Sequence, residues 1–298
     1  MTAGLALFSH TTAFLEKLRK GPTVEIIVQL SLCLVIFHGF SARYFSVAVA
    51  FLVLPALLYR PFFQHWLFWG LIAAVSGFVV LRQWYPIDNH KFLLSYWALA
   101  LALAFSLSEK HQQSFLVKTA RILLVFVMVA AVVHKTLAAD YLDGSFFEFT
   151  LLTDQRLAPF MAALGVDRGD LSYNRGIISW LLAATPEHDT GAAVLRVSPS
   201  AHTIAVVVTW WDYLVQVAIA IAFLIGTRWL DLVGHILLLA FVVTTYLAAP
   251  VIGFGWTMSI LGYALSAERF PKIALCYLAT FPLLTVYDGL QFFQQVHP

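Results

Sequence analysis

Nine long apolar runs, interrupted by few charges, dominate this sequence of 298 residues. They lie near residues 24–41, 44–59, 62–81, 92–107, 118–138, 202–225, 229–250, 252–267 and 272–290. A helix that crosses the hydrocarbon core of a bilayer needs about 17–25 such residues. The second, fourth and eighth runs are short for that task, so the pattern predicts eight or nine transmembrane helices.

The composition supports the same interpretation. Hydrophobic residues make up 61% of the chain and charged residues 11%, whereas soluble proteins contain about 45–50% and about 25%. The runs are continuous rather than alternating, which favours helices over a β-barrel. We therefore expect one all-α, polytopic transmembrane bundle over residues 1–298. A net charge of +2 without a basic stripe excludes nucleic acid as an expected partner.

The distribution of Lys and Arg over the short loops predicts a cytoplasmic N-terminus, as in a bacterial inner (plasma) membrane protein. Residues 1–22 resemble an amphipathic segment that lies on the membrane surface. Residues 139–201 then face outward, and aromatic side chains such as Phe146 and Phe160 recur there among charges. This long interruption predicts a re-entrant or interfacial, partly helical cap over an outward-facing cavity.

Ionisable residues inside apolar runs are candidates for function, because a charge at the centre of a span costs about 2.5–3.5 kcal/mol on insertion scales. Asp212, within Thr209-Trp210-Trp211-Asp212-Tyr213, is the deepest. It could pair with a histidine or lysine across the bundle, or be protonated, and either a functional role or a structural polar bridge is open. Asp231 lies at the end of a predicted span, where we expect water to reach it.

Two clusters stand apart, and both are predicted at the same depth on the outward side. Trp84-Tyr85-Pro86-Ile87-Asp88-Asn89-His90-Lys91 precedes the fourth run. His134-Lys135 ends the fifth run and is followed by Asp140-Tyr141-Leu142-Asp143-Gly144. A lysine in a partly desolvated position could act as a base. The alternative is that Lys135 snorkels to water from the end of its span.

These stretches give the sequence a resemblance to a known family. Asp88-Asn89-His90-Lys91-Phe92-Leu93, followed by His134-Lys135-Thr136-Leu137 and Asp140 to Gly144, resembles the membrane domain of vitamin K-dependent γ-carboxylases. It also resembles the wider bacterial group called the horizontally transferred transmembrane (HTTM) domain. The motifs themselves cover about 20 residues, and the order of spans agrees over roughly residues 20–290.

The resemblance implies a chemistry in which a lysine deprotonates reduced vitamin K, whose oxidation drives the carboxylation of glutamate. His90 matches the functional histidine of the family and Asn89 its neighbour. The family's lysine position falls on Thr136, so Lys135 is one residue early, and one residue turns a side chain by about 100° on a helix. We expect no protein carboxylation, because no large domain lies outside the spans.

The first hypothesis is therefore an HTTM-like membrane enzyme, an oxidoreductase or lyase that acts on a quinol or related lipid. A vitamin K-like quinone or hydroquinone is the expected cofactor. His90, Lys135 and His134 are the candidate catalytic residues. The candidate ligand contacts are Asp88, Asn89, Trp84, Tyr85, Thr136, Asp212 and Trp211, although the tryptophans could instead form an interfacial belt.

The alternative is a non-catalytic subunit that binds a lipid, quinone or pigment within a larger complex of membrane subunits. A small-solute transporter is the third class, and the lack of internal repeats disfavours it. The histidines and cysteines show no ligand spacing, so we predict no metal site. Gly253-Phe254-Gly255 follows no strand and predicts close helix packing rather than a nucleotide site.

Overall fold

The computed structural model describes residues 23–38, 53, 60–82, 89–183, 194–248 and 251–296, and this part of the chain contains no β-strand. The predicted amphipathic segment 1–22 lies outside these residues, as does the predicted span at 44–59 apart from Val53. The predicted all-helical class is confirmed for the described residues. The helices are α2 (Thr23–His38), α4 (Arg60–Phe63), α5 (Trp66–Arg82), α6 (Asn89–Ser106), α7 (Glu109–Leu137), α8 (Ser145–Thr153), α9 (Ala158–Ala163), α10 (Arg168–Ala183), α11 (Pro199–Ile225), α12 (Arg228–Ala248), α13 (Ile252–Ser266) and α14 (Pro271–Val296), with a short 3₁₀ turn at Gln155–Leu157.

Three helices are long and apolar enough to cross a membrane: α7, α11 and the Arg228–Tyr246 part of α12. Shorter apolar helices occupy Thr23–Phe37, Trp66–Arg82, Lys91–Ser106 and Pro271–Tyr287. Each predicted apolar run that falls within the described residues therefore contains a helix. The ends of α11 follow from its sequence, since Ser198 caps its first turn, Pro199 starts it, and Gly226 ends it in the left-handed conformation at φ 68°.

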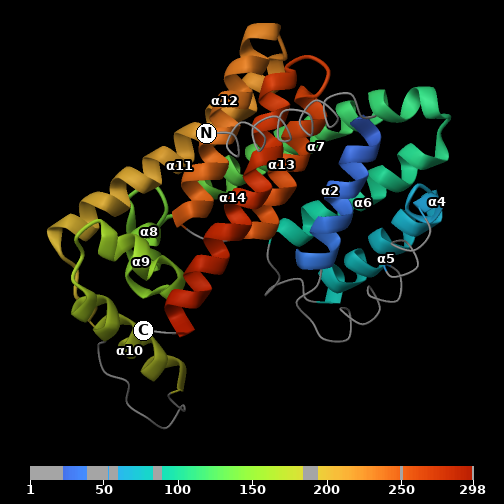
Figure 1. Ribbon diagram of the computed structural model, residues 1–298. Helices are drawn as coiled ribbons and strands as arrows, with labels where there is room; N and C mark the ends of the chain where they lie inside the picture. Colours follow the sequence, from blue (N-terminus) through green and yellow to red (C-terminus); the bar gives the residue numbers. More distant parts are fainter. Residues whose placement is uncertain are drawn as a thin grey trace, which may run out of the picture.

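Helix α13 lies at the centre of the described bundle, where it packs against α2, α6, α7, α12 and α14 (Figure 1). Nearly all of its side chains are buried. Its glycines allow this contact: a Cβ on Gly262 would lie 2.3 Å from Tyr277 Cζ, and one on Gly255 would lie 2.8 Å from Tyr246 Cδ2. The close packing predicted for the Gly253–Gly255 stretch is confirmed at Gly255.

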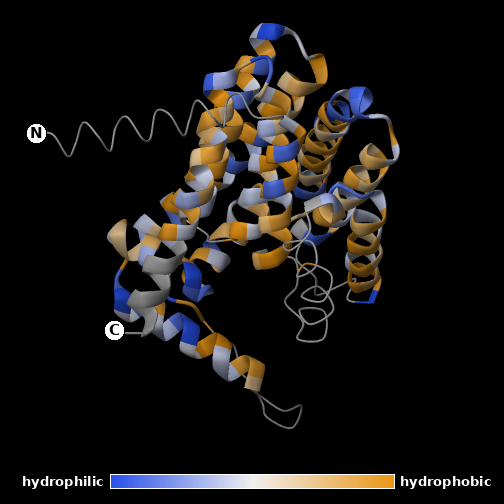
Figure 2. Ribbon diagram, turned by 45° about the vertical axis from the view of Figure 1, so that its right-hand side comes forward, coloured by the Kyte–Doolittle hydropathy of each residue, from blue (hydrophilic) through white to orange (hydrophobic). Residues whose placement is uncertain are grey.

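The outer faces of the helices are apolar as well. Large hydrophobic side chains are exposed on α5, α7, α11 and α12, including Phe78, Phe126, Leu224 and Ile236. Figure 2 shows this distribution, with hydrophobic residues along the length of the bundle helices. Soluble monomers rarely expose so much contiguous apolar surface, and a membrane would cover it.

The segment between α7 and α11 is partly helical, as predicted. Helices α8, α9 and α10 share a small separate core with the first turns of α11. That core consists of Leu151, Leu152, Leu157, Met161, Val166, Leu171, Ala201 and Ala205. His202 Nδ1 and Glu148 Oε2, 2.5 Å apart, also join α11 to α8. We call α8 to α10 the cap; that it covers a cavity stays a prediction.

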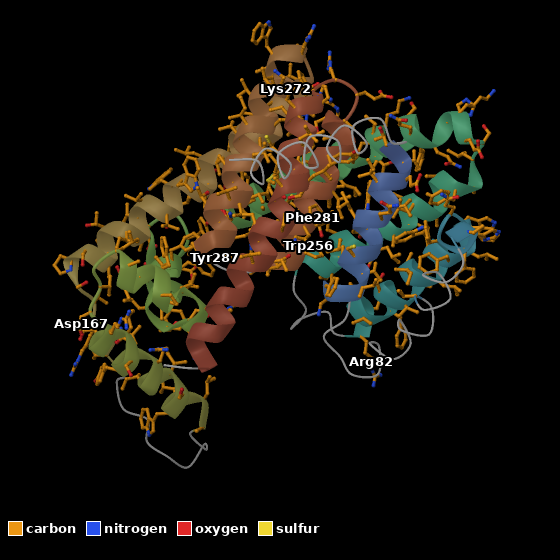
Figure 3. The ribbon with its side chains drawn as sticks, in the orientation of Figure 1. Arg82, Asp167, Trp256, Lys272, Phe281 and Tyr287 are labelled. Atoms are coloured by element: carbon orange, nitrogen blue, oxygen red, sulfur yellow. The ribbon has the colours of Figure 1, made fainter. Side chains whose placement is uncertain are left out.

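The bundle has two distinct ends (Figure 3). Lys272, at the start of α14, lies at one end, whereas Arg82 and Asp167 lie toward the other. Between them, the rings of Trp256 on α13 and Phe281 on α14 pack with centroids 4.9 Å apart. We call the end with Lys272 the loop end and the end with the cap the cap end.

Candidate functional site

A buried ion pair joins α7 to α11 near the cap end. Lys135, in the last turn of α7, donates a hydrogen bond from Nζ to Asp212 Oδ2. Only 15% of the Lys135 side chain and 11% of the Asp212 side chain are exposed. Of the alternatives left open for Asp212, the structure therefore shows pairing with a lysine across the bundle. Lys135 turns inward to this partner, so it does not snorkel to water.

Two further residues complete the polar cluster, and sequence reasoning did not include them among the site residues. The Tyr141 hydroxyl donates to Asp212 Oδ2. Gln216 Nε2 donates to Asp212 Oδ1 at 2.9 Å, and Gln216 Oε1 accepts from Lys135 Nζ at 2.9 Å. Gln216 follows Asp212 by four residues on one helix, a spacing that places two side chains together and could have revealed it. We call Lys135, Asp212, Tyr141 and Gln216 the lysine centre.

The turn after α7 positions Tyr141. Helix α7 ends at Leu137, and Gly144 adopts φ 89°, which only glycine adopts readily. Gly144 N–H donates to the Tyr141 carbonyl at 3.1 Å, and Phe146 N–H donates to the Asp140 carbonyl at 2.7 Å. The Tyr141 ring then stacks on Phe146, with centroids 5.5 Å apart. The Asp140–Gly144 motif thus delivers a hydroxyl to Asp212.

Burial, followed by the negative charge and hydrogen bonding of Asp212, raises the pKa of the Tyr141 hydroxyl far above its ordinary value. Tyr141 therefore keeps its proton and acts as a donor to the carboxylate. Lys135 Nζ also lies 5.1 Å from the centroid of the Tyr141 ring, within the range of a cation–π contact. The tyrosine consequently contacts both charges of the pair.

Lys135 and Thr136, the two residues between which the family's lysine position is offset, face different residues of α11. Thr136 Oγ1 lies 2.9 Å from the Tyr213 hydroxyl and donates to the Val132 carbonyl at 2.8 Å, so it faces the exposed edge of α11. Lys135, and not Thr136, faces Asp212. His134 is exposed and takes no part in the cluster. Trp211 is also exposed, and its Nε1 donates to Thr244 Oγ1 on α12 at 3.1 Å.

The other predicted cluster lies largely outside the described residues. Asn89 and His90 are the first two residues of α6, and their side chains lie outside the described residues, as do Trp84, Tyr85 and Asp88 entirely. Helices α6 and α7 form a pair joined at Leu107 and Ser108. That the two clusters lie at equal depth stays a prediction.

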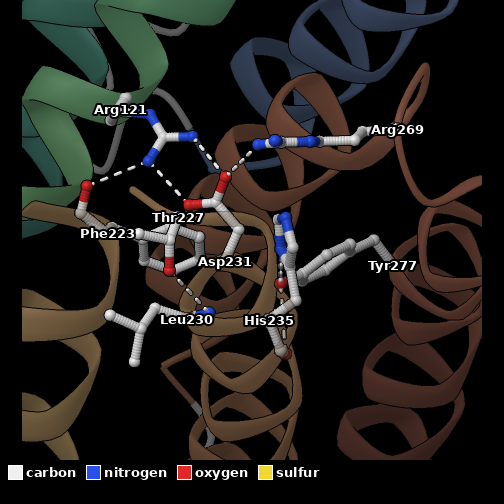
Figure 4. A network of polar contacts seen from close by, with 8 residues as sticks. All are labelled: Arg121, Phe223, Thr227, Leu230, Asp231, His235, Arg269 and Tyr277. Carbon is white, nitrogen blue, oxygen red and sulfur yellow. Dashed lines mark hydrogen bonds and ion pairs between the residues drawn. The ribbon is translucent and has the colours of Figure 1, made fainter. Parts of the chain in front are cut away.

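A second charged cluster occupies the loop end, and sequence reasoning missed it (Figure 4). Arg121 on α7 donates hydrogen bonds to both carboxylate oxygens of Asp231 on α12, from Nη1 to Oδ1 at 2.7 Å and from Nη2 to Oδ2 at 2.9 Å. Arg269 Nη1 donates to Asp231 Oδ2 at 2.7 Å. The expectation that water reaches Asp231 is wrong, because its side chain is only 2% exposed. The two arginines exclude the water. We call Arg121, Asp231 and Arg269 the arginine centre.

The arginine centre also closes a helix end. Arg121 Nη1 donates to the Phe223 carbonyl at 2.9 Å, which satisfies one of the last carbonyls of α11. One turn along α12 from Asp231, His235 is buried, and its Nδ1 lies 3.0 Å from the Tyr277 hydroxyl. His235 thereby joins α12 to α14 (Figure 4).

No family model, curated protein or solved structure matches this chain. Among the described residues, no group of three or more histidine, cysteine, aspartate or glutamate side chains could hold a metal ion. The lysine centre offers an amine, a carboxylate and a phenol that share hydrogen bonds, which is a set of groups able to hold and transfer a proton.

Proposed function

We propose that this chain is an HTTM-like integral membrane protein of a bacterial inner membrane, with eight or nine spans and a cytoplasmic N-terminus. In this proposal it binds a quinol or related lipid at the lysine centre and removes a proton from the lipid's hydroxyl group. The three helices able to cross a membrane and the apolar outer faces support the membrane assignment. The orientation rests on the Lys and Arg residues of the short loops.

The observation that carries the proposal is the buried Lys135–Asp212 pair at the cap end of a long apolar helix. An ionic pair at this depth is costly and is a functional candidate for that reason. Three aromatic residues whose side chains are partly exposed lie next to Asp212 in the sequence of α11, namely Trp210, Trp211 and Tyr213. Exposed rings of this kind offer flat apolar surface, which a site for the aromatic head group of a lipid requires.

The proton transfer within the pair can be written explicitly. One proton moves from the Lys135 ammonium to the Asp212 carboxylate, which leaves a neutral amine and a neutral acid. The amine lone pair then accepts the proton of the ligand hydroxyl, which leaves a quinolate anion beside the Lys135 ammonium. Tyr141 and Gln216 keep their hydrogen bonds to Asp212 throughout and hold it in place.

The first experiment is mass spectrometry of solvent extracts from the protein purified in detergent. We expect one enriched quinone or isoprenoid at near-stoichiometric amount in the wild type. Lys135→Met should lower the rate of quinol turnover by at least about 100-fold, which is the usual contribution of a general base. Lys118→Met is the matched control, since Lys118 lies on the same helix but far from the lysine centre. Bulk phospholipid alone, with equal turnover in both variants, would contradict the proposal.

A second candidate, a non-catalytic lipid- or quinone-binding subunit, is favoured by one specific observation. Asp212 already accepts hydrogen bonds from Lys135, Tyr141 and Gln216, so its oxygens are well satisfied without a ligand. Such a closed cluster is also what a purely structural bridge between α7, α11 and the cap would contain. A subunit should co-purify with partner membrane chains in fixed ratio, whereas an isolated monodisperse particle would contradict this second candidate.

A further inference from the structure

The arginine centre contains one more positive charge than the Asp231 carboxylate can neutralise. Arg121 alone contacts both oxygens of Asp231 in the two-point geometry that suits a carboxylate. Arg269 adds a second guanidinium to the same carboxylate. The three side chains therefore carry a net charge of +1 around a buried anion. A surplus positive charge at the end of an apolar bundle attracts an anion.

The surplus charge is presented to the surface. The Asp231 side chain is 2% exposed, whereas the side chains of Arg121 and Arg269 are 31% and 48% exposed. Among the described residues, no hydrogen bond occupies Nε or Nη2 of Arg269. The buried carboxylate thus holds Arg121 by two contacts and Arg269 by one, and it leaves part of Arg269 available to an outside acceptor.

Neighbouring groups reinforce the positive potential. Arg228 is the first residue of α12 and Lys272 lies in the first turn of α14, and both are exposed at the loop end. Glu268, next to Arg269 in sequence, opposes this potential with its negative charge and accepts a hydrogen bond from Gln113 at 2.5 Å. The basic side chains of Arg121, Arg269, Arg228 and Lys272 still outnumber the carboxylates of Asp231 and Glu268. The N-terminus of α12 adds its partial positive charge at the same place.

We propose that the arginine centre, with Arg228 and Lys272, is a binding site for the phosphate group of an anionic phospholipid. Basic pockets between transmembrane helices recognise such head groups. The guanidinium fork suits the phosphate oxygens better than an ammonium does. The apolar faces of α7 and α12 flank the site and supply a surface for the acyl chains.

The test uses the full chain in a neutral detergent with dioleoylphosphatidylglycerol or dioleoylphosphatidylcholine at equal mole fraction. Retained lipid is counted by native mass spectrometry. We expect the wild type to retain phosphatidylglycerol in preference to phosphatidylcholine. Arg269→Gln should weaken retention of phosphatidylglycerol about five-fold, which is the effect of one basic residue near a membrane surface. Arg269→Lys should recover part of it.

Arg269→Gln is the informative variant because it leaves the Arg121–Asp231 pair intact, so the fold should survive. Arg156→Gln is the matched control: it removes an arginine that is paired with Asp154 in the cap. Equal retention of the two lipids, or equal behaviour of the Arg269 and Arg156 variants, would overturn the proposal. Displacement of phosphatidylglycerol by inorganic phosphate at millimolar concentration would overturn the assignment to a lipid.

Discussion

The two buried carboxylates among the described residues, Asp212 and Asp231, are neutralised in different ways. Asp212 in the lysine centre contacts one cation and two neutral donors, so the cluster has no net charge. Asp231 in the arginine centre contacts two cations, so that cluster is positive. The lysine centre can therefore remain at the cap end without an external anion, whereas the arginine centre favours one. The same residue type thus lies in a neutral cluster in one place and in a positively charged cluster in the other.

The comparison also extends to what each carboxylate joins. Asp212 connects α7, α11 and the turn that leads into the cap, so its loss should loosen the cap end. Asp231 connects α7, α12 and the residues after α13, and through Arg121 it also holds the end of α11. The arginine centre should therefore contribute more to the stability of the bundle than the lysine centre.

The largest expected effect is that of Asp231→Asn. This variant leaves two guanidinium groups side by side without a counter-ion. Breaking a buried ion pair from one side costs about 3–5 kcal/mol, and we expect the lower end, about 3 kcal/mol, because the side chains of Arg121 and Arg269 are 31% and 48% exposed and water solvates them in part. We expect the free energy of unfolding, measured by SDS titration in mixed micelles, to fall by that amount. Asp212→Asn is the matched comparison. It should lower the free energy of unfolding by less, because it leaves only one cation, Lys135, without its carboxylate partner. A larger effect of Asp212→Asn would reverse our ranking of the two centres.

The next effect concerns coupling within the lysine centre. Lys135→Met leaves the Asp212 carboxylate with Tyr141 and Gln216 as its donors, and we expect a loss of roughly 2 kcal/mol in the free energy of unfolding. The double variant Lys135→Met, Asp212→Asn removes both charges and should be more stable than Lys135→Met alone. A double-mutant cycle measures this coupling. Additive losses would mean that the pair is not energetically linked.

Sequence reasoning predicted the parts of this molecule that depend on local pattern. The apolar runs gave the helices, because a continuous apolar stretch has few alternatives in a membrane. Asp212 and Lys135 were identified for the same reason: a charge inside such a run is conspicuous. Gln216 was not predicted as a site residue because it is uncharged, although its spacing of four residues from Asp212 indicates that the two side chains lie together.

The arginine centre could not be predicted in this way. Its members lie 110 and 38 residues apart in sequence, and each sits near the end of an apolar run, where a charge is ordinary. Only the packing of α7, α11 and α12 shows that they meet and exclude water. The one-residue offset of Lys135 was similarly ambiguous, since a rotation of about 100° is meaningful only once the position of α11 is known.

The smallest of the expected effects is that of Tyr141→Phe, and it depends on pH. A hydrogen bond to a charged group contributes about 1.5–3 kcal/mol, and we expect a loss near the lower value at neutral pH because Lys135 and Gln216 still contact Asp212. The pKa of the Tyr141 hydroxyl is raised in the folded protein. The folded state therefore keeps this proton at a pH where the unfolded chain, with an ordinary tyrosine pKa of about 10, loses it.

The sign of the effect follows from proton binding. Above about pH 10 the unfolded state binds fewer protons than the folded state, so the wild type should lose stability as the pH rises. Below about pH 10 the contribution of Tyr141 is fully present. Tyr141→Phe removes this titration, so its unfolding free energy should fall less steeply between about pH 10 and 11, as measured by SDS titration at each pH. Tyr213→Phe, whose hydroxyl contacts only Thr136 among the described residues, is the control and should keep the wild-type slope. Identical slopes in Tyr141→Phe and the wild type would show that the Tyr141 hydroxyl does not donate to Asp212 in solution.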